Sequence, residues 1–256
     1  MCLILFAWKT HTNFPLVLIA NRDEFYERPT APADFWEEAP GLLAGKDLRG
    51  GGTWLGITRK GRLAAVANYR DPARMKDGAP SRGNLVADYL RGRRSPEAHL
   101  RALSPGAARY NGFGLLVGNP DELHYFSNRG AQTRLLPGVH GLSNHLLDTP
   151  WPKVERGKQA LSDILERERT PSLKRIFALL SDRSRPPDER LPDTGVGLEW
   201  ERALSPLFIE SPLYGTRSST VLIIDYQGRV LFAERVFTSG AEPWMTSRFD
   251  FRIDGK

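Results

Sequence analysis

The order of the expected secondary-structure elements predicts an α+β fold, in which antiparallel sheets are covered by layers of helices. Apolar or alternating runs bounded by glycine- and proline-containing turns occur in three blocks, and two blocks with helical periodicity separate them. A doubly wound fold would instead alternate single strands with single helices along the chain, so we exclude that class. The chain has 256 residues, of which 40% are hydrophobic, and we expect one domain spanning residues 1–256.

The first block of strands occupies roughly the first 70 residues. Its expected strands are Leu3–Trp8, Pro15–Ala20, Trp54–Thr58 and Leu63–Asn68. The second strand leads directly into the polar cluster Asn21-Arg22-Asp23-Glu24. The last two strands flank a turn that contains Gly61, which is typical of a hairpin. Gly50-Gly51-Gly52 precedes them and supplies backbone freedom that other residues lack.

The remaining blocks alternate between helices and strands. We expect a helix capped by Ser81, a helix Ser95–Leu103 with Pro96 in its first turn, and helices at Thr149–Arg167 and Ser172–Leu180. The expected strands are Phe113–Val117, Glu122–Ser127, the pair Thr133–Leu136 and Val139–Ser143, and the hairpin Thr220–Asp225 and Val230–Phe237. Residues 181–199 are rich in proline and aspartate, which predicts a long mobile loop.

Composition narrows the function classes. The net charge is +6, but the 36 lysines and arginines are scattered and form no nucleic-acid-binding signature, so we expect a surface that favours small anions. A single cysteine excludes an intrachain disulfide framework and a cysteine-based zinc cluster, and the five histidines lack metal-ligand spacing. The first apolar run is too short for a signal peptide, and no run is long enough to cross a bilayer. We therefore expect a cytoplasmic protein without a membrane span.

Cys2 stands directly after the initiator Met. Removal of Met1 would give this residue both a thiol and a free α-amine, whose ordinary pKa of about 7.7–8.0 allows it to act as a base near neutral pH. A nucleophile that carries its own base is the principle of N-terminal-nucleophile (Ntn) hydrolases. The alternative is that Cys2 is a small hydrophobic residue packed at the start of a strand.

Four further polar segments lie next to expected strands, where sheets commonly present functional groups. These are Asn21-Arg22-Asp23-Glu24, Ala67-Asn68-Tyr69-Arg70, Gly141-Leu142-Ser143-Asn144-His145 and Gly215-Thr216-Arg217-Ser218-Ser219-Thr220. Three of them have a simpler interpretation. The first could be a solvated turn with ion pairs worth ~0–1 kcal/mol, Arg217 could form a structural salt bridge, and Asn144 could cap a turn. Trp54 and Trp151 are more typical of core residues than of cofactor contacts.

An ordered set of motifs resembles the NRDE-motif family, the relatives of the transport and Golgi organisation protein, over nearly the whole chain. The motifs are Asn-Arg-Asp-Glu at 21–24, Gly-Gly-Thr-Trp-Leu-Gly at 51–56, Asn-Tyr-Arg at 68–70, Ser-Arg-Gly at 81–83, Tyr-Asn-Gly-Phe at 110–113, Gly-Leu-Ser-Asn at 141–144, Leu-Asp-Thr-Pro-Trp-Pro-Lys-Val at 147–154 and Tyr-Gly-Thr-Arg-Ser-Ser-Thr at 214–220. The resemblance implies a four-layer αββα sandwich of the Ntn-hydrolase type.

The order of the polar segments also resembles the penicillin V acylase and bile-salt hydrolase group of Ntn enzymes. By that analogy, Asp23 would hold the amine and thiol of Cys2, and Asn68 and Asn144 would donate to an oxyanion. Arg22 and Arg217 would lower the thiol pKa or orient a carboxylate. One departure is that Arg22 and Asp23 are adjacent here, so they must point to opposite sides of a strand.

Two functions follow from the resemblance. The first is a Cys2-dependent amidohydrolase or acyl-transferring enzyme that acts on a small amide or thioester and needs no cofactor. The second is a carrier of haem, acyl-coenzyme A or a lipid in the same pocket, with haem as a transported ligand. In both, the ligand would be a small anionic or amphipathic molecule. The expected ligand-contacting residues are Asn21, Arg22, Glu24, Tyr69 and Arg70.

Overall fold

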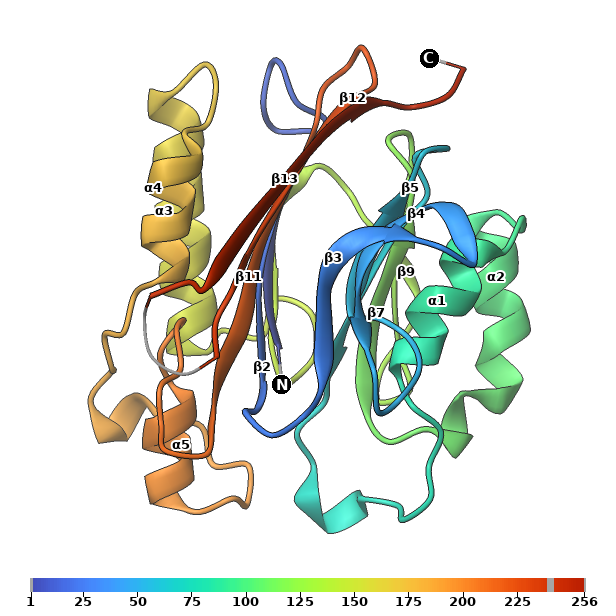
Figure 1. Cartoon of the computed structure of the whole chain (residues 1–256). Helices are drawn as coiled ribbons and strands as arrows, with labels where there is room; N and C mark the ends of the chain where they lie inside the picture. The colour runs from blue at the N-terminus through green and yellow to red at the C-terminus, as the bar shows by residue number, and fades with distance from the viewer. Residues whose placement is uncertain (1, 239–241, 256) are drawn as a thin grey trace.

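Two antiparallel β-sheets pack face to face, and each is covered on its outer side by helices. The computed structural model describes residues 2–238 and 242–255, and within these residues one sheet has six strands and the other seven. In Figure 1 the helices α3 and α4 lie on one side of the paired sheets and α1 and α2 lie on the other. The chain therefore forms an αββα sandwich.

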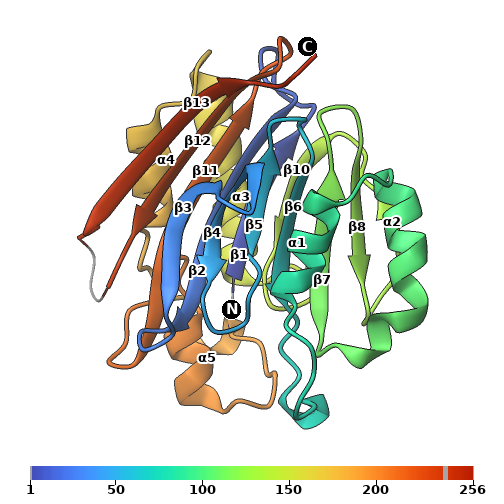
Figure 2. The ribbon, with the colours of Figure 1, turned by 45° about the vertical axis from the view of Figure 1, so that its right-hand side comes forward.

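The first sheet has the strand order β10-β1-β2-β11-β12-β13. Its strands are β1 (Cys2–Trp8), β2 (Leu16–Phe25), β10 (Gly138–Leu142), β11 (Tyr214–Ile224), β12 (Arg229–Val236) and β13 (Met245–Arg252). The second sheet has the order β3 to β9 in sequence. Its strands are β3 (Thr30–Trp36), β4 (Ala39–Asp47), β5 (Leu55–Thr58), β6 (Leu63–Asn68), β7 (Phe113–Gly118), β8 (Leu123–Ser127) and β9 (Thr133–Arg134). Figure 2 shows the two sheets from a second direction.

The helices fall into two groups that match the two outer layers. They are α1 (Gly83–Arg91), α2 (Pro96–Leu103), α3 (Pro152–Arg167), α4 (Leu173–Leu180) and α5 (Leu198–Leu204), with 3₁₀ turns at Pro72–Arg74, Ser104–Arg109 and Asp188–Arg190. In α1, Leu85, Val86, Tyr89 and Leu90 are buried at helical spacing, so one face of the helix packs on the second sheet.

Strand β1 shows why the sandwich has three apolar layers. Cys2, Ile4, Phe6 and Trp8 belong to the core between the two sheets. Leu3, Leu5 and Ala7 belong to the core between the first sheet and helices α3 and α4. Because successive side chains alternate between the faces of a strand, a strand buried on both faces must be apolar throughout. The uninterrupted apolar run therefore specifies an interior strand between two cores.

Two glycines fix the approach of helix α1 to the sheet. Gly51 has a φ of +76°, which favours glycine, and a Cβ on Gly52 would lie 2.4 Å from the carbonyl carbon of Gly83. This close approach places the residue before α1, Arg82, next to the start of β1 and the end of β2. The glycine run predicted from sequence thus positions part of the pocket described below.

Several expected elements differ from the structure. Ser81 does not cap α1: the N-cap position is Arg82, and no side chain bonds the free amides there. Helix α3 begins at Pro152 and not at Thr149. The strands expected at 133–136 and 139–143 do not pair with each other, because β9 pairs with β8 while β10 pairs with β1 in the other sheet. The predicted loop 181–199 includes the start of α5.

Three strands were not expected from the sequence. β3 contains Pro32 and two register irregularities, which suits its position at the edge of the second sheet. β4 continues it as an antiparallel partner, and β13 forms the far edge of the first sheet. Strand β11 also begins at Tyr214, so the polar cluster containing Arg217 lies inside a strand and not before one.

Candidate functional site

Cys2 lies at the beginning of β1, opposite Arg22 of β2 in the antiparallel register. Residues opposite each other in such a pair share a face of the sheet, and this face is the one that meets the second sheet. Only 9% of Cys2 is exposed. Burial raises the pKa of the Cys2 thiol, and the nearby positive charge of Arg22 opposes that rise without reversing it. The thiol therefore needs a base for activation, because its surroundings do not lower its pKa.

A pocket of about 300 Å³ opens beside Cys2, at the end of the gap between the two sheets. The first sheet contributes Cys2, Arg22, Asp23 and Glu24 to its wall. The other lining residues are Arg28, Asp47, Thr53, Trp54, Val66, Asn68, Ala79, Pro80, Ser81, Arg82, Gly83 and Asn111. The pocket therefore joins the start of β1 with the ends of β2 and β6 and the segment that precedes α1.

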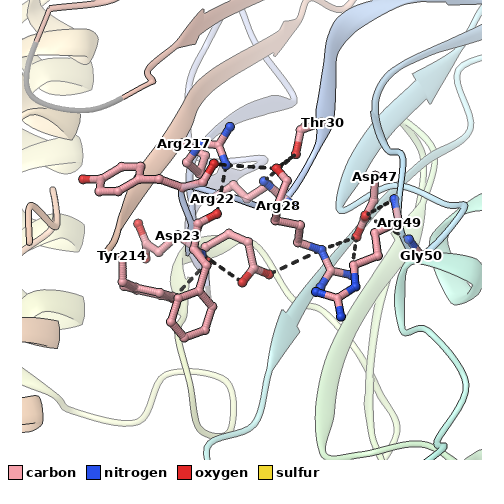
Figure 3. A network of polar contacts seen from close by, with 12 residues as sticks. Arg22, Asp23, Arg28, Thr30, Asp47, Arg49, Gly50, Tyr214 and Arg217 are labelled. Atoms are coloured by element: carbon pink, nitrogen blue, oxygen red, sulfur yellow. Dashed lines mark hydrogen bonds and ion pairs between the residues drawn. The ribbon is translucent and has the colours of Figure 1, made fainter. Parts of the chain in front are cut away.

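The cluster at 21–24 lies within β2 and not in a turn after it, because β11 pairs with β2 as far as Phe25. Its side chains alternate between the two faces of the strand, as predicted for Arg22 and Asp23. Arg22 lies over the ring of Trp54, with 4.3 Å between the guanidinium carbon and the ring centroid, and donates to Thr30 Oγ1. Figure 3 shows Arg22 and Thr30 side by side.

Asn21 and Asp23 lie on the opposite face of β2. Asn21 Nδ2 donates to the carbonyl oxygens of Leu180 and Leu207, at 2.8 Å each, and its Oδ1 accepts from Ser219. The fully buried Asn21 side chain is therefore anchored beneath the helical layer and does not line the Cys2 pocket. Its expected role as a ligand contact stays a prediction that this placement does not favour.

Asp23 is buried at the point where β2 and β11 meet. Its Oδ1 accepts from Thr216 Oγ1 at 2.8 Å, and its backbone carbonyl accepts from the hydroxyl of Tyr214. Burial raises the pKa of the Asp23 carboxyl, and the positive charges of the amino terminus and Lys153 oppose the rise. The predicted contact between Asp23 and the α-amine of Cys2 stays a prediction.

Arg28 links the two sheets at the mouth of the pocket. Its Nε and Nη2 donate to Asp47 Oδ2 at 3.0 and 2.8 Å, and Glu24 lies 3.8 Å from its Nε. Figure 3 shows Arg28 reaching from the end of β2 to Asp47 at the end of β4. Burial tends to raise the pKa of Glu24, but the surrounding positive charges, those of Arg22 and Arg28 included, lower it overall. Glu24 and Asp47 are thus ionised partners of Arg28.

The two predicted asparagines lie together, but only one lines the pocket. Asn68 ends β6 and is part of the pocket wall. Asn144 Nδ2 donates to the carbonyl oxygen of Asn68 at 3.2 Å, and Asn144 is fully buried. Continuing the register of β1 and β10 by two residues would place Asn144 opposite Cys2. Asn144 therefore connects the segment after β10 to the end of β6.

Tyr69 and Arg70, both expected to contact a ligand, lie away from the Cys2 pocket. Tyr69 forms a 2.7 Å hydrogen bond with His145. Arg70 forms a buried ion pair with Glu201 at 2.6 Å and donates to Asn144 Oδ1 at 3.2 Å. Burial lowers the pKa of the Arg70 guanidinium, and Glu201 opposes this effect. Arg70 thus holds the Asn144 side chain in place and does not line the Cys2 pocket.

Arg217 occupies a bulge in β11, between the residues that pair with Asp23 and Arg22. Its Nη1 donates to the carbonyl oxygens of Phe25, Tyr26 and Arg28, at 2.9 to 3.1 Å, and its Nε donates to Phe237. Arg217 does not line the Cys2 pocket. Within residues 2–238 and 242–255 Arg217 forms no salt bridge, and its hydrogen bonds hold the loop that carries Arg28. Its expected effect on the thiol pKa or on a ligand carboxylate stays a prediction.

Arg82 is the main pocket residue that sequence reasoning missed. It precedes α1, donates to the carbonyl oxygen of Gly112 at 3.0 Å, and lies close enough to Cys2 for their charges to interact. Its motif, Ser-Arg-Gly at 81–83, was part of the family resemblance, and that was the available signal. Trp54, expected in the core, both packs there and lines the pocket.

The sequence matches a family model described as "Transport and Golgi organisation 2" over residues 1–239. The chain is 37% identical to the transport and Golgi organization protein 2 homolog of Bos taurus and 34% identical to that of Homo sapiens. Each alignment covers 99% of this chain and 99% of the relative. The chain belongs to the transport and Golgi organisation 2 family. The resemblance seen in the motifs is therefore confirmed.

Solved structures show which fold this family member has. The chain resembles the C2A mutant of the conjugated bile acid hydrolase from Clostridium perfringens, with a TM-score of 0.54, 9% identity, and coverage of 100% of this chain and 94% of that one. It also resembles the Caenorhabditis elegans ortholog of N-acylethanolamine-hydrolyzing acid amidase, with a TM-score of 0.50, 12% identity, and coverage of 87% and 92%. The expected Ntn-hydrolase-like αββα fold is confirmed.

Over residues 2–238 and 242–255, no cluster of three or more histidine, cysteine, aspartate and glutamate side chains could hold a metal ion. In the same residues, no helix combines the length and the apolar character needed to cross a membrane.

Proposed function

We propose that the protein is a Cys2-dependent amidohydrolase of the Ntn type that acts on a small amide or thioester. One observation carries the proposal: the single thiol of the chain lines a polar pocket at the start of an Ntn-like β-strand. A cysteine packed only as a small hydrophobic residue would not need a polar pocket beside it. The two fold relatives are titled as a hydrolase and an amidase, which supports this reaction class.

The reaction follows from the position of the thiol. After removal of Met1, the α-amine of Cys2 would accept the thiol proton, and the sulfur would attack the substrate carbonyl carbon. The C–N bond then breaks, the leaving amine takes up the proton, and water hydrolyses the resulting thioester. A cytoplasmic location, which the composition suggests, would keep this single thiol reduced.

Asn68 is the proposed oxyanion donor, because it lines the pocket together with Cys2. One such donor contributes roughly 2.7–4 kcal/mol to lowering the barrier. Asn144 positions it, since its side chain donates to the Asn68 carbonyl oxygen and holds the end of β6. Asp23 is proposed to orient the amine, as it lines the pocket beside Cys2 and its carboxylate is fixed by Thr216.

Intact mass and turnover test the proposal together. Wild type and Cys2→Ala should both lose Met1, because both second residues are small, so the pair differs only in the thiol. Both proteins are assayed against a panel of N-acyl amides and acyl thioesters, with circular dichroism as a folding control. We expect turnover in wild type alone. Retention of Met1 in an active protein, or equal turnover in Cys2→Ala, contradicts the proposal.

A second candidate function is binding and transport of an amphipathic anion such as haem or acyl-coenzyme A. It is favoured by a wider depression of about 780 Å³ beside the Cys2 pocket, lined by Phe25, Trp200 and Tyr214 together with Arg49 and other residues of the pocket mouth. Phe25 is 46% exposed and Trp200 is 44% exposed, which is unusual for large apolar side chains.

Ligand titration separates the carrier from the enzyme. A carrier should bind haem or palmitoyl-coenzyme A in a 1:1 ratio, and Cys2→Ala should change the affinity by less than about twofold. Trp200→Ala should weaken binding by about tenfold, whereas Trp244→Ala, a similarly exposed tryptophan outside the depression, should not. Binding that is equally strong in Trp200→Ala excludes this depression as the binding site.

A further inference from the structure

Two arginines of the Cys2 pocket, Arg22 and Arg82, have no carboxylate partner among the residues that the structure describes. Arg22 makes one hydrogen bond, to the neutral Thr30 hydroxyl, and Arg82 makes one, to the carbonyl oxygen of Gly112. A guanidinium group carries five N–H donors. Both side chains therefore keep most of their donors available at the pocket wall.

The carboxylates that line the pocket are engaged elsewhere. Asp47 accepts two bonds from Arg28 and further bonds from the backbone amides of Arg49 and Gly50. Glu24 lies beside Arg28 and accepts from the amide of Phe25. Arg28 thus pairs directly with two acidic neighbours. The charge of Glu24 also acts on Arg22 and Arg82, but neither forms a direct ion pair with a carboxylate of the described residues.

Both arginines are held in place without a counter-ion. Only 5% of Arg22 is exposed, and its guanidinium lies over the ring of Trp54. Arg82 is fixed by Gly112 and by its place at the start of α1, where Gly52 and Gly83 are in close contact. Partly buried charges without a direct ionic partner destabilise a fold. Their presence in a cleft therefore indicates a binding site for an anionic ligand that pairs with them.

We propose that Arg22 and Arg82 form a carboxylate-binding subsite next to Cys2, and that the amides hydrolysed there carry a carboxylate group. The inference rests on the proposed hydrolase function and names its substrate class. The planar fork of arginine matches the two oxygens of a carboxylate, and two arginines on different walls would bind it from two sides. The second arginine of the site is then Arg82, since the donors of Arg217 bind backbone carbonyls.

The substrate test uses matched pairs of amides that differ only in charge. N-phenylacetylglycine carries its carboxylate on the amine side of the scissile bond, and N-benzylsuccinamic acid carries it on the acyl side. Each is compared with its uncharged primary amide. Wild type should hydrolyse at least one acid with a kcat/KM about tenfold or more above its neutral counterpart, and Arg82→Gln should abolish this preference. The control is Arg91→Gln, because Arg91 lies on the same helix, is exposed and pairs with Glu38.

A binding experiment keeps the inference testable if no turnover is found. Cys2→Ala is titrated calorimetrically with the same acids and amides, alone and combined with Arg82→Gln or Arg91→Gln. The acid should bind about tenfold more tightly than its amide in Cys2→Ala and in Cys2→Ala/Arg91→Gln, but not in Cys2→Ala/Arg82→Gln. Equal binding of acid and amide in Cys2→Ala overturns the subsite. Selective binding without turnover in wild type supports the subsite and instead contradicts the hydrolase proposal.

Discussion

Replacing Glu201 by Gln should destabilise the protein far more than an ordinary loss of an ion pair. Arg70 and Glu201 are 6% and 4% exposed at their side chains, and their charged atoms lie 2.6 Å apart. Removing one charge of such a pair leaves the other buried without compensation, which costs about 3–5 kcal/mol. We expect about 3 kcal/mol for Glu201→Gln, because the Gln oxygen can still accept a hydrogen bond from Arg70.

The matched control is Glu97→Gln. Glu97 pairs with Arg101 at 2.8 Å, but the two side chains are 60% and 76% exposed, so the expected loss is only about 0.3–0.5 kcal/mol. Urea unfolding followed by circular dichroism gives both free energies of unfolding. Because Arg70 also holds Asn144, the proposed hydrolase function predicts that Glu201→Gln lowers kcat more than it changes KM in the folded protein. Equal unfolding midpoints for the two variants would refute the reasoning.

Three further predictions concern buried groups. Burial raises the pKa of Glu234 to about 7, so the folded chain keeps a proton that the unfolded chain releases near pH 4.5. Wild type should therefore lose up to about 3 kcal/mol relative to Glu234→Gln as the pH rises from 4.5 to 7.5, and parallel pH profiles of the urea midpoints would contradict this. Asn21→Ala removes three buried hydrogen bonds and should lower the free energy of unfolding by about 3 kcal/mol. The control Asn13→Ala, at an exposed residue, should lower it by less than about 0.5 kcal/mol. Similar urea midpoints for the two variants would disprove the anchoring role of Asn21. In protein that retains Met1, the rate at which iodoacetamide labels Cys2 should rise with a midpoint pH above that of a free thiol, because burial raises the pKa of the Cys2 thiol. A lower midpoint pH would show that the thiol is activated by its charged surroundings.

Secondary-structure elements were predictable where the pattern of apolar residues within a single segment was sufficient to identify them. The apolar run of β1 and the helical spacing in α1 each reflect local burial, and both elements are present. The edge strands β3 and β13 were missed for different reasons. β3 contains a proline, while β13 alternates half-buried with exposed residues and so shows a weaker apolar signal. Edge strands have one strand neighbour each, so their sequences are less constrained.

The site was predictable as a set of segments but not as a set of contacts. Cys2, Arg22 and Asn68 meet at one pocket because β1 pairs with β2 and the sheet that contains β6 packs against them. The ion pair between Arg70 and Glu201 joins residues that are 131 positions apart. Nothing in either local sequence encodes that pairing, so the burial of Arg70 could not be foreseen.

The cluster at 21–24 serves two purposes because it lies inside a paired strand. Asn21 faces buried partners in the first sheet and the helical layer, and Asp23 accepts from Thr216 on the same face while also reaching the pocket wall. Arg22 and Glu24 face the gap that contains Cys2. A strand with period-two alternation forces this division, since adjacent side chains cannot share a face. Substitutions of Asn21 and Asp23 should therefore reduce stability. A substitution of Asp23 should also disturb the proposed orientation of the Cys2 amine. Substitutions at the even-numbered positions should leave the fold nearly intact and alter ligand binding, Arg22 most of all. A motif with a single function would not show this alternation between stability and binding along four consecutive residues.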